Sequence, residues 1–412
     1  MHRSRHEASA CEMLGTVLMS SIALVLVVRE AGHRLEVLDA ESLSPLGRCR
    51  LPHALQGTPL RSPDGRYLYV AAADGWALRL DLQNFTQVLH TRTGTGLKSL
   101  ALSADGRWLL AGHMQPHSLV LLDAQLQPAR IYQTAARAGG ASSAVSGIWN
   151  SAARQRFVVA FQDLPEIWEL SYDTAAEPIY DGLVHDYRMG EAIASAGYLG
   201  VRRTPLQQPL HIFLTDTNLR HVLAAPQGKG TAGEVTVTGV DVINMDIRRR
   251  ITSREVPGRP LEDSGVAFST QQHEWLAFAT QPEGRLVLMD ATRWQVHAGL
   301  LQSVRGVATV RTHPGAPQLW LSPAANGQPS DTIVLVDKAD FRVSALLREQ
   351  SVSWTSVSFS AGGRHAVLAA RGAQGSVRLV DTQTLQELKR LALPHVEAVF
   401  ALDGPALTSP RY

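Results

Sequence analysis

The hydrophobic and polar positions of this chain repeat one pattern: a short apolar run, a turn, and a second run closing on an aspartate. The runs are rich in Val, Leu and Tyr and too short for helices, so they predict β-strands. Two turns read Ser-x-Asp-Gly-Arg, at 62–66 and 103–107, and a third reads Ser-Ala-Gly-Gly-Arg at 360–364; in each, Gly supplies the positive φ of a tight hairpin. Eight copies end at positions 39, 81, 123, 171, 216, 290, 337 and 381; position 171 holds Ser instead of Asp.

The spacing of these copies indicates the architecture. The intervals are 42, 42, 48, 45, 74, 47 and 44 residues, and a period in the forties is one four-stranded propeller blade. We therefore predict an all-β fold, a single eight-bladed β-propeller over residues 20–412. The 74-residue interval predicts an inserted hairpin or long loop at about 225–258. Its Arg248–Arg250 either meet an anionic group or form a solvated charge run.

The N-terminal region allows two interpretations. Met13 to Val28 is an apolar run behind Arg3 and Arg5, which suits the core of an export signal. It is shorter than a membrane-spanning helix requires, and no small-x-small cleavage site follows it. If the run were removed, the first blade would lose a strand and expose an edge. We therefore expect a strand within the run, and treat residues 1–19 as an N-terminal extension, a candidate export remnant.

Composition and missing motifs narrow the function. The chain is 45% hydrophobic and 18% charged with a formal charge of +2, which argues against disorder and against a nucleic-acid partner. Cys11 and Cys49 are too few for a disulfide framework, and without C-x-x-C-H no covalent c-type haem is expected. Nucleophile elbows, phosphate loops and dinucleotide fingerprints are also missing.

Several stretches resemble one known family. They are VLVVREAGHRLEVLD (25–39), SPDGRYLYVAAADG (62–75), RFVVAFQDLPEIWELSY (156–172), LVHD (183–186), RPLED (259–263) and VATVRTHP (307–314). Together they resemble the haem d1 domain family, which includes the propeller half of cytochrome cd1 nitrite reductase and the NirF-type haem d1 biosynthesis proteins. The likeness spans about residues 20–400, is stronger to the biosynthesis type, and agrees with eight blades. Propellers of the YVTN type share only the SPDGRYLYVA hairpin.

The resemblance implies a cofactor and its site. The cofactor would be haem d1 or a d1-type precursor, bound non-covalently in the central funnel. Arg29 stands where the family places an arginine near the tetrapyrrole carboxylates. His53 is the candidate to ligate the iron or donate a proton, and His185 beside Asp186 is a second such candidate. The alternative interpretation is that Arg29 is a surface arginine and that His53 and His185 are ordinary loop histidines.

The sequence departs from the family pattern at residues expected to contact the haem, which affects the function that can be expected. The family's haem-contacting histidine falls here at Gln56 or Gly57, Pro260 runs directly into Leu261 without the P-H-L-E histidine, and Ala73 replaces an arginine. Nitrite reduction is disfavoured, because it needs distal histidines and a c-type haem.

The function we expect is the binding of a tetrapyrrole intermediate in haem d1 biosynthesis, a part of denitrification. The alternative is a propeller scaffold that lost haem binding and mediates protein–protein interaction. Whether the chain catalyses a reaction stays open. Partners would be the tetrapyrrole and other haem d1 maturation proteins, with no stable membrane span. The resemblance implies a periplasmic location; the lack of a convincing signal peptide leaves the cytoplasm as the alternative.

Other histidines are given structural interpretations. His113 and His117 flank a hairpin turn, where four-residue spacing does not build a ligand pair, so both are expected to be solvated. His313 sits at a turn and is expected to be structural.

Overall fold

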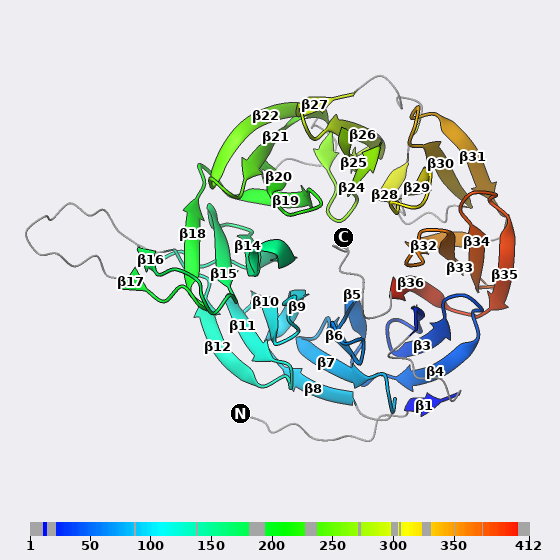
Figure 1. Ribbon diagram of the computed structural model, residues 1–412, viewed down its shortest axis with the longest axis horizontal. Helices are drawn as coiled ribbons and strands as arrows, with labels where there is room; N and C mark the ends of the chain where they lie inside the picture. Colours follow the sequence, from blue (N-terminus) through cyan, green and yellow to red (C-terminus); the bar gives the residue numbers. More distant parts are fainter. Residues whose placement is uncertain are drawn as a thin grey trace, which may run out of the picture. The chain divides into compact units, whose positions relative to one another are not determined.

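The computed structural model describes residues 11–14, 22–85, 88–136, 139–180, 194–226, 237–270, 273–297, 304, 306–323, 331–350, 352–372 and 374–402 (Figure 1). Apart from one 3-10 turn, η2 (Ala152–Arg154), the regular elements of these residues are strands. The chain divides into two compact units: unit 1 holds Met1–Ala73, Leu78–His90 and Ile212–Tyr412, and unit 2 holds Asp74–Ala77 and Thr91–His211.

Eight sheets of four or five strands form from the described residues, which confirms the predicted eight-bladed β-propeller.

Unit 1 holds blades 1, 6, 7 and 8 and most of blades 2 and 5. Blade 1 is β36 (Val396–Leu402), β2 (Leu24–Arg29), β3 (Arg34–Asp39), β4 (Pro45–Arg50) and β1 (Cys11–Met13); blade 2 is β5 (Leu55–Arg61), β6 (Tyr67–Ala72), β7 (Trp76–Asp81) and β8 (Val88–Arg92). Blade 5 is β19 (Leu210–Thr215), β20 (His221–Pro226), β21 (Val237–Asn244) and β22 (Arg249–Pro257). Blade 6 is β23 (Arg259–Pro260) and β24 (Val266–Thr270), both paired with β25 (His273–Gln281), then β26 (Arg285–Asp290) and β27 (Gln295–Val296). Blade 7 is β28 (Val307–Arg311), β29 (Gln318–Pro323), β30 (Thr332–Asp337) and β31 (Val343–Arg348); blade 8 is β32 (Ser353–Phe359), β33 (His365–Arg371), β34 (Ser376–Asp381) and β35 (Glu387–Ala392).

Unit 2 holds two complete blades and a small additional sheet. Blade 3 is β9 (Thr95–Leu102), β10 (Trp108–Gln115), β11 (Ser118–Asp123) and β12 (Pro128–Gln133); blade 4 is β13 (Val145–Ser151), β14 (Arg156–Phe161), β15 (Glu166–Ser171) and β18 (Val201–Pro205). Between β15 and β18, β16 (Ile179–Tyr180) pairs with β17 (Ala194–Ser195). Blades 3 and 4 share one buried core that includes Phe157, Phe161 and Trp168.

The strands of each blade have fixed ends, which we name for later use. The loop end carries the connection from second to third strand and the connection from the fourth strand to the next blade. The turn end carries the connections from first to second and from third to fourth strand. These follow from the antiparallel order of every blade.

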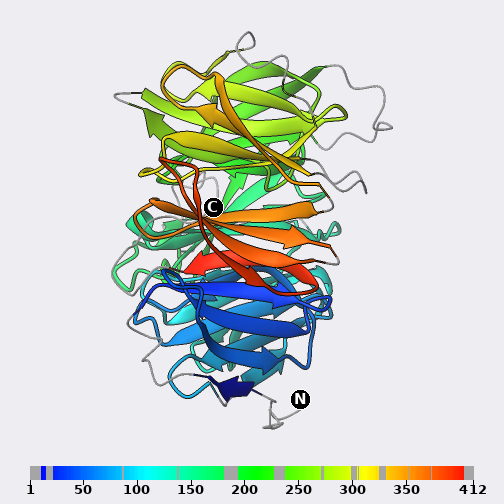
Figure 2. The same cartoon turned by 90° about the vertical axis from the view of Figure 1, so that its right-hand side faces the viewer.

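Closure of blade 1 joins the two ends of the described chain. β36 pairs with β2 along its length, from Leu24 opposite Leu402 to Arg29 opposite Val396. In Figure 2 the red C-terminal strand lies directly against the blue sheet. All six residues of β2 are buried. The strand expected within the N-terminal apolar run is therefore present; residues 15–21 of that run lie outside the described residues.

The repeated sequence signals correspond to turns. In the first-to-second-strand turns, Gly65, Gly106 and Gly363 have φ of 74°, 70° and 68°, as predicted. In the third-to-fourth-strand turns, the closing aspartate accepts backbone N–H groups; Asp39 Oδ1, for example, accepts from Ser42 N at 2.7 Å. A left-handed residue follows, as at Leu43 (φ 51°). The aspartates therefore hold the turn end together.

This turn chemistry corrects the predicted insertion at 225–258. Residues 237–257 form β21 and β22, the third and fourth strands of blade 5. Asn244 Oδ1 accepts from Asp246 N (2.9 Å) and Ile247 N (3.2 Å), so Asn244 occupies the place of the repeat aspartate. Asp216, predicted to close the fifth copy, instead follows the first strand β19.

The extra residues therefore lie earlier in the chain. The interval from Ser171 to Asn244 is 73 residues, and that from Asn244 to Asp290 is 46. The long interval includes residues 172–200 between β15 and β18, which contain the small β16–β17 sheet. The Arg248–Arg250 run lies in the β21–β22 hairpin, where Arg250 pairs with Asp241 at 3.4 Å.

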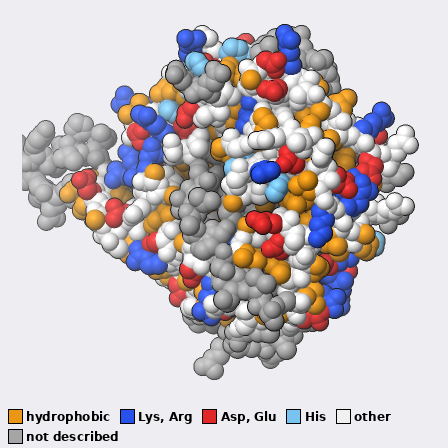
Figure 3. Space-filling view, turned by 45° about the vertical axis from the view of Figure 1, so that its right-hand side comes forward, with side chains coloured by type: hydrophobic (Ala, Val, Ile, Leu, Met, Phe, Trp, Pro, Cys, Tyr) orange, Lys and Arg blue, Asp and Glu red, His pale blue; other side chains and the backbone are white. Residues whose placement is uncertain are grey.

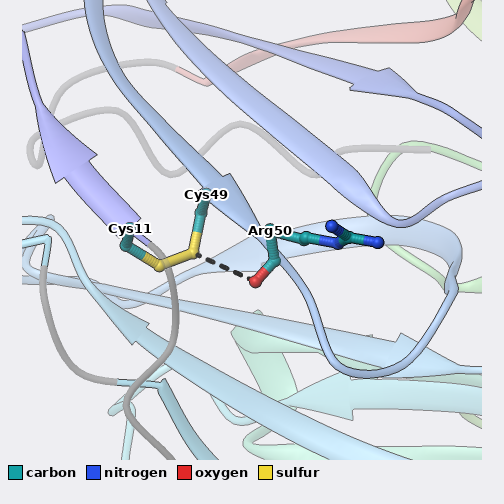
Figure 4. Close-up of a disulfide and its surroundings, with 3 residues drawn as sticks. All are labelled: Cys11, Cys49 and Arg50. Carbon is teal, nitrogen blue, oxygen red and sulfur yellow. Dashed lines mark hydrogen bonds between the residues drawn. A yellow bond between two sulfur atoms is a disulfide. The ribbon is translucent and has the colours of Figure 1, made fainter.

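A disulfide fixes the outer edge of blade 1. β1 pairs with β4, with Cys11 opposite Cys49, and their sulfur atoms are bonded (Figure 4). The Cys49 residue is 1% exposed. The two cysteines, too few for a disulfide framework, thus make a single clip between strands. Within the described residues, no helix has the length and apolar character to cross a membrane.

Candidate functional site

The first strands of the blades bulge near the loop end. In blades 1, 3, 4, 7 and 8 the first strand carries one extra residue relative to the second strand. In blade 2, Gln56 pairs with Ala71 and Leu60 with Tyr69, so the first strand carries two extra residues between these pairs. In blade 6, Pro260 pairs with Thr280 and Val266 with Ala277, so the first strand carries three extra residues between these pairs. Bulges re-aim side chains and are common beside active sites, so blades 2 and 6 of unit 1 present the most modified first strands.

The blade 2 bulge contains Gln56 and Gly57, the two positions at which the sequence resemblance predicts a histidine. Gln56, Gly57 and Thr58 are exposed. Gly57 has φ of 73°, and a Cβ added there would meet no atom within 4 Å. The strand therefore leaves open space at Gly57.

His53 lies just before this bulge, in the connection from blade 1 to blade 2. It is half-buried, and its ring packs edge-on against the ring of His90 with centroids 5.6 Å apart. His90 is 8% exposed and comes from β8, the fourth strand of blade 2. The pairing was not predicted, because the two residues are 37 positions apart and meet only through the sheet order.

Arg29 lies at the loop end of blade 1 and has structural partners. It is 6% exposed, forms an ion pair with Glu36 across the β2–β3 hairpin, and donates Nε–H to the carbonyl of Pro394 at 2.8 Å. The Pro394 contact ties β2 to the segment that leads into β36. The guanidinium therefore supports closure of blade 1, whatever else it binds.

The other predicted site residues, His185 and Asp186, lie outside the described residues. The described residues on either side belong to the connection between the third and fourth strands of blade 4. That connection leaves its blade at the turn end, whereas Arg29 ends β2 and His53 follows β4, both at the loop end of blade 1.

The blade 6 bulge brings together two stretches that the family resemblance singled out. RPLED forms β23 and the start of the bulge, in which Asp263 has φ of 51° and is exposed. Arg311, the last residue of β28, donates Nη1–H to the carbonyl of Asp263 at 3.2 Å. Arg311 was not predicted as a site residue, because its contact with Asp263 spans 48 residues.

Buried histidine positions also differ from expectation in unit 2. His113 was expected to be solvated but is 0% exposed; Nδ1 meets the Ser118 carbonyl at 3.2 Å and Nε2 meets Thr93 Oγ1 at 2.8 Å. Burial lowers its pKa below the ordinary value. His117 bonds Ser142 Oγ at 2.8 Å on the exposed side. Among the described residues, no group of three or more His, Cys, Asp or Glu is placed to hold a metal ion.

On the face of the molecule shown in Figure 3, neither positive nor negative side chains predominate. Basic and acidic side chains are interspersed there with hydrophobic ones. This agrees with the near-balance of 39 basic and 37 acidic residues in the whole sequence. Electrostatic steering of a polyanion is not indicated by this face.

Comparisons with known proteins place this geometry in a family. The chain is 29% identical over 371 residues to dihydro-haem d1 dehydrogenase of Pseudomonas aeruginosa, covering 90% of this chain and 69% of that protein. It is 23% identical over 391 residues to protein NirF of Stutzerimonas stutzeri, covering 92% and 90%.

Solved structures agree. A structure of dihydro-haem d1 dehydrogenase NirN in complex with DHE matches with a TM-score of 0.79 and 27% identity, over 94% of this chain and 76% of that one. Apo AztD from Citrobacter koseri, at a TM-score of 0.54 and 10% identity, shares the fold alone.

The profile of the cytochrome d1 haem domain matches residues 20–181 and 196–401. The gap between the matched ranges contains His185 and Asp186 and falls in the connection from β15 to β18, where the extra residues of this chain lie. Because the two matched ranges cover nearly the whole chain and all eight blades, this chain belongs to the cytochrome d1 haem domain family.

Proposed function

We propose that this chain binds a d1-type tetrapyrrole non-covalently and acts in haem d1 biosynthesis. The observation that carries the proposal is the match, over 94% of the chain, to a family member solved in complex with DHE. Both curated relatives reported above match along the same length.

The molecule itself offers features that suit such a ligand. A macrocycle needs room at the first strands, cations for its carboxylates, and an imidazole where the iron is ligated. The open space at Gly57, the half-buried His53 before it, and Arg311 are candidates for these roles within unit 1. Arg29 is a candidate whose guanidinium is already paired with Glu36. When bound, the macrocycle would bring the iron and the conjugated ring; the protein's part is to position, desolvate and hold it.

The residue assignments follow from these positions. We propose His53 as the group that approaches the iron or donates a proton, with Arg29 and Arg311 as carboxylate candidates. His185 and Asp186 remain candidates only through their motif. Since Gln56 and Gly57 replace the family's histidine, we expect weaker axial ligation than a family member with that histidine has.

We also propose an oxidising compartment such as the periplasm. The Cys11–Cys49 disulfide supports this location, because disulfides persist in the periplasm and are rare in a reducing cytosol. Other haem d1 maturation proteins would be the partners that deliver or receive the tetrapyrrole.

The test is a visible-absorption titration of the purified full chain with haem d1 and with dihydro-haem d1. We expect a saturable spectral shift at micromolar or tighter affinity, weakened in His53→Ala and unchanged in His117→Ala, a loop histidine of unit 2. Gly57→His is expected to sharpen the haem bands by adding an axial imidazole, since His tolerates positive φ better than most residues.

Other outcomes would point to the alternative. No spectral shift with either macrocycle, from protein that melts cooperatively, would sink tetrapyrrole binding and leave a propeller scaffold for protein partners. A shift that His53→Ala leaves unaltered would keep the function and remove His53 from the site.

A further inference from the structure

The hydrogen-bond acceptors of Arg311 among the described residues are backbone carbonyls. Arg311 is half-buried at the end of β28, and its Nη1 donates to two backbone carbonyls, Val310 O at 3.0 Å and Asp263 O at 3.2 Å. Both acceptors are neutral. Within the described residues, no carboxylate lies at ion-pair distance from this guanidinium.

The other arginines buried in unit 1 are treated differently by the fold. Arg29, 6% exposed, pairs with Glu36, and Arg378, 3% exposed, pairs with Glu349 and, at 3.4 Å, with Glu387. A desolvated cation without an anion is costly, so buried charges are ordinarily paired. Within the described residues Arg311 is thus a partly desolvated cation without a carboxylate partner. The half-buried Arg254 is another, since it donates to the carbonyls of Trp294 at 2.7 Å and Ser253 at 2.9 Å, and of the two Arg311 contacts the blade 6 bulge.

Two opposing effects act on the charge of Arg311. Burial lowers its pKa below the ordinary value, and the nearby Asp263 charge acts in the opposite direction. Asp263 itself is exposed in the blade 6 bulge and offers its carbonyl to Arg311. With Nη1 committed to carbonyls, the Nε–Nη2 edge of the guanidinium is the fork left for a bidentate anion.

We propose that Arg311 is a carboxylate-binding residue of the tetrapyrrole site, a role that rests on the proposed function. One carboxylate of the macrocycle would take the counter-ion position beside the blade 6 bulge. The bulge serves this by holding the Asp263 carbonyl against Nη1, which orients the guanidinium before the ligand arrives. A cofactor side chain thereby completes an ion pair that the described residues leave open.

The experiment compares two ligands on three proteins. Haem d1 and its fully methyl-esterified form are titrated by visible absorption into wild type, Arg311→Gln and Arg311→Lys. We expect Arg311→Gln to weaken haem d1 by about 10- to 100-fold, the range for a hydrogen-bonded charge. The ester should bind wild type more weakly and should lose little further affinity in the variant, while Arg311→Lys recovers part of the loss.

Arg364→Gln is the matched control, because its side chain is 76% exposed and its partner Asp381 lies 3.6 Å away. It should leave both affinities unchanged. Equal losses of haem d1 and ester in Arg311→Gln, or no loss, overturn the inference while tetrapyrrole binding stands. Failure of wild type to bind haem d1 overturns the proposed function and the inference together.

Discussion

Lys338 is a buried cation that the fold holds in place with a single carbonyl. It follows β30, is 7% exposed, and donates from Nζ to the His313 carbonyl at 3.0 Å. Burial lowers its pKa to about 8, with the neighbouring Asp337 acting in the opposite direction. The charged form is therefore less favourable in the folded protein than in the unfolded chain.

This shift gives a signed prediction. Between about pH 8 and 10.5 the unfolded chain binds more protons at Lys338 than the folded protein does, so stability rises with pH there. Each pKa unit is worth about 1.4 kcal/mol, so the difference amounts to roughly 3 kcal/mol. Lys338→Met should raise stability at pH 7 by about 1–3 kcal/mol and flatten that rise, measured by urea unfolding across pH.

Lys389→Met is the control for that experiment, since Lys389 lies exposed on β35. It should change neither the stability nor its pH dependence. A wild-type stability that stays level from pH 8 to 10 would contradict the assignment.

At single residues, sequence reasoning succeeds where the turn dictates the residue and fails where a distant segment decides the environment. The aspartates at 39, 81 and 381 were recognised from local pattern and do bond their own turns. His113 was judged by its hairpin position, but Thr93 and Gly94 of the preceding connection bury its ring. Arg311 was missed because its environment is set by a bulge in another blade.

Elements were predicted well as strands and less well in their assignment to blades. β19 ends in an apolar run and Asp216, so it imitates a third strand, while Asn244 ends the true third strand. An asparagine side chain accepts the same backbone N–H groups as an aspartate, so a search for Asp alone shifts the blade boundary. Because of that shifted boundary, the long connection was predicted at 225–258 and not at 172–200.

The Cys11–Cys49 disulfide predicts a redox-dependent stability. It closes a loop of about 38 residues, for which the chain-entropy model gives up to about 4 kcal/mol. β1 has only three residues at the edge of blade 1, so it can detach locally. Part of the stabilisation by the disulfide is lost for that reason. We expect Cys11→Ser to lower the melting temperature by a few degrees.

A reductant is the control. Dithiothreitol should lower the wild-type melting temperature toward that of Cys11→Ser and leave the variant unchanged. A wild-type melting curve that ignores reductant would refute a stabilising disulfide.

For the whole molecule, the fold followed from the repeat period, because every blade needs the same turns and the same alternation. What the period did not reveal is which residues the blades bring together. The His53–His90 pair and the Arg311–Asp263 contact depend on sheet order and on the lengths of two bulges.

Closure of blade 1 predicts that one strand near the C-terminus supports the entire fold. Val399 is 2% exposed in β36 and packs in the blade 1–blade 8 core. Val399→Asp places an unpaired charge in that core and should cost more than about 4 kcal/mol. We expect loss of the cooperative thermal transition, with aggregation through the exposed edge of β2.

The matched control is Leu388→Asp on β35, where the leucine is 51% exposed. It should stay within about 0.5 kcal/mol of wild type. A Val399→Asp protein that melts like wild type would mean that β36 is dispensable.

The same closure also sets an order in time. During synthesis β2 emerges early, yet its partner strand is made hundreds of residues later; the Arg29–Pro394 contact alone spans 365 positions. Such non-local pairing makes folding slow and leaves a hydrophobic strand waiting. A nascent chain therefore cannot hold a finished blade 1 until its last strand is free. A macrocycle that relies on Arg29 can therefore be bound only after β36 has been synthesised and has paired with β2.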